Sequence, residues 1–144
     1  MNKNIILLVE SNPDDEYLIK KAFNDIRIFN EVFVVKDSEE ALNYLFMEGA
    51  YSSRESQKVG IILLDLSFSR SNEFGIIKSI REDKRTQMIP IVVLISSSED
   101  EKNYSNSYIG VNSVLRKPED FDQLTKTVQQ LGLYWLHVNE NPFS

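Results

Sequence analysis

The sequence of 144 residues predicts an α/β protein with a three-layer, doubly wound fold around a sheet of five parallel strands. The first observation is a series of short apolar runs rich in Ile, Val and Leu, which is typical of strands covered on both faces. The second is that most segments between these runs carry apolar residues at three- and four-residue spacing, as amphipathic helices do. Strands that alternate with helices pair in parallel through right-handed crossovers, which places one sheet between two layers of helices.

The first strand and the first helix are predicted from the opening of the chain. The apolar run at 4–9 is short and contains β-branched residues, as a buried strand does. Asn12 is suited to cap the following helix and Pro13 to begin it. The apolar residues that define the face of this helix are Tyr17, Leu18, Ala22, Phe23 and Ile26.

A second strand and helix follow. The run at 31–35 predicts the strand, and either Asp37 or Ser38 can cap a helix that ends near Gly49. The segment 50–60 is polar and aperiodic, which indicates a loop.

The middle of the chain repeats this alternation. The run at 61–66 predicts a third strand, with Asp65 at its end, and a helix is expected at 74–81. The run at 89–96 predicts a fourth strand, which Pro90 opens where a missing N–H is tolerable.

The last third predicts one more strand and helix. Segment 98–110 is rich in Asn and Ser and is weakly helical at best. Segment 111–118 predicts a short fifth strand, and 119–132 predicts a helix. The apolar residues at helical spacing in that helix are Phe121, Leu124, Val128 and Leu131.

Composition and length limit what the protein can be. The net charge of −6 argues against a nucleic-acid partner, because binding the phosphate backbone needs clustered Lys and Arg. The chain has no cysteine, which excludes disulfides and thiolate metal ligands. No apolar run reaches the length of a membrane span, so we expect a cytoplasmic protein without membrane contact. The length fits a single domain at 1–144, with a core at about 4–131 and a C-terminal extension at 132–144.

Doubly wound folds bind their ligands beyond the carboxyl ends of the strands, so the residues at the predicted strand ends are the candidates for a site. These residues are Glu10 and Ser11, Asp65 to Ser67, Ile95 with Ser96, and Lys117 with Pro118. Acids from two strands, a hydroxyl from a third and a lysine from a fourth suit a phosphoryl group held on a carboxylate. Mg²⁺ is the metal expected to accompany such a group.

Six segments together resemble the receiver domains of two-component response regulators, and specifically the small stand-alone kind found beside phytochromes. The segments are "ILLVESNPDD", "IILLDL", "IPIVVL", "SSSEDE", "VNSVLRKPEDFDQL" and "LGLYWL". The resemblance implies the flavodoxin-like strand order 2-1-3-4-5 and a signalling domain that is not an enzyme. It also implies a protein partner, a sensor histidine kinase, that donates the phosphoryl group.

The resemblance assigns roles to particular residues. Asp65 matches the phosphoacceptor, Glu10 the first residue of an acidic pair, and Lys117 the lysine that precedes a proline. Ser67 matches the position whose backbone carbonyl binds Mg²⁺.

Three positions depart from the family pattern. Ser11 stands where an aspartate normally ligates Mg²⁺, Ile95 replaces the hydroxyl residue that contacts the phosphoryl group, and Val114 replaces an aromatic switch residue. Asp14 and Asp15 are expected to serve the first helical turn rather than a metal, because acids there favour the helix dipole. The metal pocket is therefore expected to lack one carboxylate and to bind Mg²⁺ weakly.

Three functions compete at this point. We favour a degenerate receiver, which keeps the fold but acts through protein contacts with weak or absent phosphorylation of Asp65. The alternative is a competent phosphoacceptor for a histidine kinase, and a more remote one is a flavodoxin-like cofactor binder or a small hydrolase. Against the last, the acidic loop after the first strand lacks the glycines of a phosphate cradle.

The C-terminal third is expected to mediate self-association into a homodimer. Tyr134, Trp135, Leu136 and Phe143 provide more apolar and aromatic surface than one closing helix needs. The only histidine, His137, has no second His or Cys with which to form a metal site.

Overall fold

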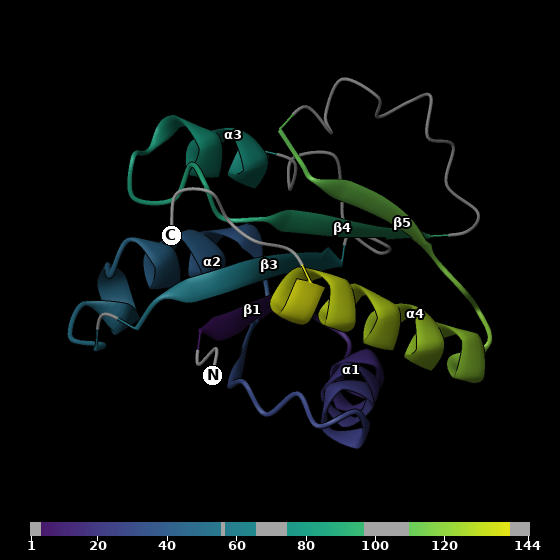
Figure 1. Cartoon of the computed structure of the whole chain (residues 1–144). Helices are drawn as coiled ribbons and strands as arrows, with labels where there is room; N and C mark the ends of the chain where they lie inside the picture. The colour runs from purple at the N-terminus through teal and green to yellow at the C-terminus, as the bar shows by residue number, and fades with distance from the viewer. Residues whose placement is uncertain (1–3, 56, 66–74, 97–109, 139–144) are drawn as a thin grey trace.

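Parallel strands form one sheet in the computed structural model, which describes residues 4–55, 57–65, 75–96 and 110–138 (Figure 1). The strands are β1 (Ile5–Val9), β2 (Val32–Val35), β3 (Val59–Asp65), β4 (Ile91–Ser96) and β5 (Ser113–Lys117). Their order across the sheet is β2-β1-β3-β4-β5, and all neighbours are parallel. The predicted fold class and strand order are confirmed.

Helices cover both faces of this sheet and complete the three layers (Figure 1). The helices are α1 (Pro13–Asp25), α2 (Ser38–Leu45), α3 (Gly75–Glu82) and α4 (Phe121–Leu133). Side chains of α2 and α3 share one core with one face of the sheet, and side chains of α1 and α4 share a second core with the other face. Successive residues of β1 alternate between these cores, as strand geometry requires: Ile5, Leu7 and Val9 enter the first, and Ile6 and Leu8 the second.

The helix starts follow the predicted capping residues. The side chain of Asn12 accepts hydrogen bonds from the backbone N–H groups of Asp14 and Asp15 at 2.8 and 3.2 Å. Asp37, rather than Ser38, caps α2 by accepting from the N–H of Glu40 at 2.8 Å. Each cap satisfies N–H groups that have no partner within the helix.

Some boundaries differ from the prediction. β3 begins at Val59, two residues before the predicted start, because Val59 already pairs with Ile5 of β1. Gly60 permits this approach, since a Cβ atom there would lie 2.7 Å from the Cβ of Asn4. β4 begins at Ile91 rather than at 89.

Two further short elements lie where none was predicted. A 3₁₀ turn, η1 (Gly49–Tyr51), occupies the start of the predicted loop. After α4 the chain continues as a π-helix, η4 (Tyr134–Val138), whose Leu136 is buried in the core shared by α1 and α4. The weak helix expected at 98–110 falls, except for Gly110, outside the described residues. Within the described ranges, none of the helices combines the length and apolar character that crossing a membrane requires.

The contact between α1 and α4 depends on a glycine. A Cβ atom at Gly132 would lie 2.6 Å from Cε1 of Phe23 and 3.0 Å from Cδ1 of Ile28, whereas one at Gly75 would meet no atom within 4 Å. Gly132 is therefore the residue that lets the two helices approach.

Gly132→Ala should destabilise the fold by about 1–3 kcal/mol, because the methyl group overpacks a buried contact. Gly75→Ala is the matched control and should be neutral or stabilising by up to about 1 kcal/mol, because alanine reduces the entropy of the unfolded chain. Urea denaturation of both variants measures the difference. Equal stability of Gly132→Ala and the wild type would contradict the assigned role.

Candidate functional site

Charged side chains from three strand ends and one helix meet at the carboxyl edge of the sheet. Glu10 directly follows β1, Asp65 ends β3, and Lys117 ends β5. Asp15 joins them from the first turn of α1. Because parallel strands all end at the same edge, residues distant in sequence converge there.

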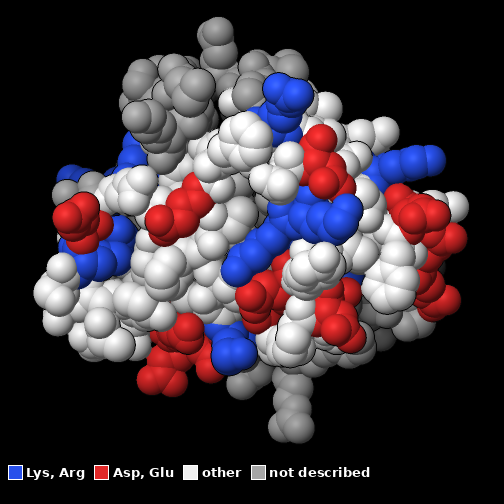
Figure 2. Space-filling model, turned by 90° about the horizontal axis from the view of Figure 1, so that it is seen from below, with Lys and Arg blue, Asp and Glu red and all other residues white. Residues whose placement is uncertain are grey.

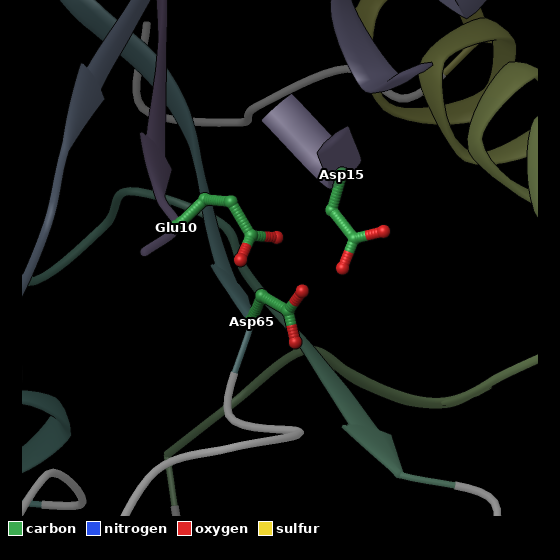
Figure 3. Close-up of side chains that lie close together, drawn as sticks. All are labelled: Glu10, Asp15 and Asp65. Atoms are coloured by element: carbon green, nitrogen blue, oxygen red, sulfur yellow. The ribbon is translucent and has the colours of Figure 1, made fainter. Parts of the chain in front are cut away.

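All four residues are buried, although burying charge is costly. Glu10 is 3% exposed, Asp65 7%, and Asp15 and Lys117 8% each. The three carboxylates face one another, and each offers an oxygen within 4.8 Å of the others (Figure 3). Such burial is tolerated only where the charges have partners of opposite sign.

Lys117 supplies that partner. Its ammonium donates hydrogen bonds to Oδ2 of Asp15 and to Oδ2 of Asp65, and it lies 3.9 Å from Oε1 of Glu10. Burial alone would lower the pKa of Lys117, but Asp65, Asp15 and Glu10 outweigh burial and raise it above its ordinary value. Lys117 is therefore charged and bridges α1 and β3.

Glu10 is the least satisfied member of the cluster. Its Oε2 accepts a hydrogen bond from the backbone N–H of Asn12 at 3.1 Å. Its Oε1 is fully buried and accepts no hydrogen bond from the part of the chain that the structure describes. Burial first, and then a hydrogen bond and charge repulsion from Asp65, raise the pKa of Glu10 to about 9. A proton on Glu10 can thus be donated toward Asp65 when no cation is bound.

The charge of the cluster fits a divalent cation. Three carboxyl groups share one ammonium in a buried space, so a cation that displaces the proton of Glu10 meets more acidic groups than Lys117 alone can neutralise. Mg²⁺ prefers carboxylate oxygens, and the carboxylate of Glu10 lies close to those of the other two acids (Figure 3). Its Oε1 has no hydrogen-bond partner among the described residues. The residues present therefore fit Mg²⁺ or a similar hard cation.

The structure corrects the prediction for Asp15. Asp14 is exposed and serves only the helix start, but Asp15 is buried and belongs to the acidic cluster. The expectation that this pocket holds one carboxylate too few, because of Ser11, is wrong in this respect. The sequence held a usable signal, since Asp15 lies at helical spacing from the buried residues Ile19 and Ala22 and so shares their face.

None of the other predicted site residues that the structure describes belongs to the acidic cluster. Ser11 is exposed. Ile95 is fully buried in the core on the side of α2 and α3, and the half-buried Val114 packs against that core. Ser96 is the last residue of β4, paired with Lys117, and only its backbone is described. Ser67 lies outside the described residues.

Comparison with known families identifies the family to which this chain belongs. Residues 6–129 match the response regulator receiver domain. The chain belongs to this family. The resemblance predicted from sequence is therefore confirmed, and we set aside the cofactor-binding and hydrolase alternatives.

Relatives of the chain include phytochrome response regulators. FilR2 of Methanothrix harundinacea, described as a probable methanogenesis regulatory protein, is 35% identical over 96% of this chain and 87% of its own length. The phosphorylated cyanobacterial phytochrome response regulator RcpA is 32% identical, with a TM-score of 0.85 over 98% of this chain and 99% of RcpA. The Mn²⁺-bound response regulator Rcp1 is 29% identical, with a TM-score of 0.83 over 96% and 99%.

The family supplies the general function. The chain is a receiver domain of two-component signalling, homologous to phytochrome response regulators. Such domains are typically signalling modules rather than enzymes, and they interact with protein partners such as kinases.

Glu10→Gln should stabilise the metal-free protein at pH 8 by at least about 1 kcal/mol, or roughly 2–4 °C in Tm for a domain of this size. The reason is that the folded pKa of Glu10, about 9, lies above its ordinary value of 4.5. Glu10 therefore contributes stability that is fully present below pH 4.5 and is lost as the pH rises through about 9. Glutamine stays neutral at every pH.

Thermal melts in a chelator between pH 5 and 9 measure this effect. The control is Glu39→Gln, which removes one charge from an exposed position of α2. A wild type and a Glu10→Gln variant with parallel pH profiles would contradict the assignment.

Proposed function

We propose that this chain is a degenerate receiver, in which phosphorylation of Asp65 is weak or absent and is not transmitted through positions 95 and 114. The observation that carries the proposal is the burial of Ile95, which is 0% exposed and packed in the core beside Val114. Isoleucine cannot donate a hydrogen bond to a phosphoryl oxygen, and valine has no ring to reorient. The side chains of Ile95 and Val114 would therefore gain no hydrogen bond or ring contact with a phosphoryl group if the conformation changed, so phosphorylation would not favour a changed conformation through them.

The pocket itself retains the groups that handle a phosphoryl group. Mg²⁺, when bound by the carboxylates of Glu10 and Asp65, would offset the negative charge of the transferring oxygens. Asp65 would form the new O–P bond through a carboxylate oxygen while the donor's bond to phosphorus breaks. Lys117, already in contact with Asp65, would lie beside the added charge. The backbone carbonyl of Ser67 is a further proposed ligand from the family pattern.

A competent phosphoacceptor is the second candidate, and one observation favours it. Asp15 adds a third carboxylate to the pocket, which compensates for the charge absent at Ser11.

We propose in either case that output passes through contacts with other proteins. The division into a core at 4–131 and an extension at 132–144 is part of this proposal, as is self-association, for which Leu133 and Tyr134, 44% and 50% exposed, supply apolar surface.

Incubation with Mg²⁺ and acetyl phosphate should give a low yield of singly phosphorylated protein, far below stoichiometric, by intact mass spectrometry. Asp65→Asn should abolish whatever adduct forms, whereas Asp122→Asn, a variant in the exposed first turn of α4, should leave it unchanged. A stoichiometric adduct that depends on Asp65 would favour the competent receiver instead.

Beryllofluoride with Mg²⁺ should shift the amide resonances of residues 110–117 only slightly in the wild type, because Ile95 and Val114 offer no contact to the bound group. The double variant Ile95→Thr, Val114→Tyr restores a hydroxyl and a ring, and should show larger shifts there. Two-dimensional amide spectra compare the two proteins, and the ligand-free spectra confirm that each is folded. Large shifts across 110–117 in the wild type would refute the degenerate assignment.

A further inference from the structure

Asp15 connects the acidic pocket to the outer layer of the molecule. It lies in the first turn of α1, between Asp14 and Tyr17, which are exposed. Its carboxylate points inward, toward Glu10 and Asp65 (Figure 3). Helix α1 is therefore part of the pocket, so a change in the partner of Asp15 acts directly on this helix.

A groove of about 350 Å³ lies between helices α1 and α4. Asp14, Tyr17 and Lys21 line it from α1, and Phe121 and Thr125 line it from α4. The rings of Tyr17 and Phe121 are 69% and 62% exposed. Lys and Arg side chains lie next to Asp and Glu side chains on the face seen from below (Figure 2).

The ion pair between Asp15 and Lys117 joins the first turn of α1 to the end of β5. Asp15 directly follows Asp14, which lines the groove, and Lys117 stands three residues before Asp120, the cap of α4. Farther along, the side chain of Gln129 donates to the carbonyl of Ala22 at 3.1 Å, and Gly132 packs on Phe23. The far end is thus held by packing, and the pocket end is held by a charge pair.

A cation in the pocket competes with Lys117 for Asp15. Both would bind the same carboxylate, and two positive groups that share it repel each other strongly in a buried site. The buried Oε1 of Glu10, which has no hydrogen-bond partner among the described residues, offers a divalent ion a contact that Lys117 reaches only at 3.9 Å. A divalent ion can therefore contact all three acids, whereas the ammonium of Lys117 donates hydrogen bonds to two of them.

We propose that the Asp15–Lys117 pair is a latch between α1 and the segment that leads from β5 into α4, and that a divalent cation opens it by taking Asp15 as a ligand in place of Lys117. Asp15 then supplies the anionic position that Ser11 leaves without charge, and α1, rather than β4 and β5, responds first to the pocket. This inference rests on the proposed function only in requiring that the pocket binds a cation.

A Mg²⁺ titration of the full chain, followed by amide spectra, tests the latch. In the wild type, saturable shifts should include residues 14–21 of α1 and 119–125 around the start of α4. Asp15→Asn should weaken the affinity for Mg²⁺ by at least about tenfold, because it removes one anionic ligand. Its metal-free spectrum at 119–125 should already resemble that of the Mg²⁺-bound wild type. Asp14→Asn is the matched control, and should change the affinity by less than about threefold.

Lys117→Gln provides the opposing arm and keeps the test valid if Asp15→Asn does not fold. It breaks the latch from the other side, so 119–125 should again shift without metal, but the affinity for Mg²⁺ should rise by at least about threefold because the competing charge is gone. A purely structural role would not produce opposite changes in affinity with the same shift.

The outcomes separate the two proposals. If Mg²⁺ saturates the wild type but Asp15→Asn binds it equally well, or if 14–21 and 119–125 do not respond, the latch is wrong and the cation site stands. If no saturable response occurs in the wild type, the cation site and the latch both fail.

Discussion

The ammonium of Lys117, enclosed by carboxylates from other elements, is the interaction on which this end of the molecule depends. Removing one partner from a buried ion pair is strongly destabilising, because the remaining charge is neither paired nor solvated by water. The ends of β3 and β5 and the first turn of α1 must therefore hold their positions together. Glu10 shows the limit of this arrangement, since burial first, and then Asp65, raise its pKa by more than the ammonium of Lys117 lowers it.

Much of this arrangement could be predicted from the sequence, because the determinants are local and periodic. Apolar runs gave the strands, and Glu10, Asp65 and Lys117 were placed at one edge because parallel strands end together. Asp15 could not be placed by the same reasoning, because its role depends on how α1 packs on the sheet. The apolar residues of α1 predict its buried face, but they do not indicate that the acidic Asp15 lies on that face. The sequence does not predict the start of β3, because Gly60 is a poor strand former. The structure shows that Gly60 lets the backbone approach Asn4, where a Cβ atom would not fit.

Ile95 stands at a position where strand packing has a clear role and where we propose that signalling capacity is lost. Along β4, alternate residues Ile91, Val93 and Ile95 enter the core on the side of α2 and α3. At the last of these positions an apolar side chain extends the core by one residue and stabilises it through burial. A hydroxyl there would instead be available to a ligand at the strand end. Under the proposed function, the isoleucine thus adds to packing at the position where polar readout is lost.

The side chains that line the pocket determine which parts of the molecule respond to a change in its charge. A bound cation or phosphoryl group acts on its surroundings chiefly through charge and hydrogen bonds, and its effect falls with distance and dielectric. Ile95 and Val114 carry neither charge nor donor, so they respond only if they are displaced physically. Asp15 and Lys117 form a direct ion pair, in which Asp15 lies in the first turn of α1 and Lys117 stands three residues before the cap of α4. Because Gly132 and Gln129 hold α1 and α4 together farther along, we expect a change at the pocket to be confined to the first turns of the two helices, where Tyr17 and Phe121 are exposed.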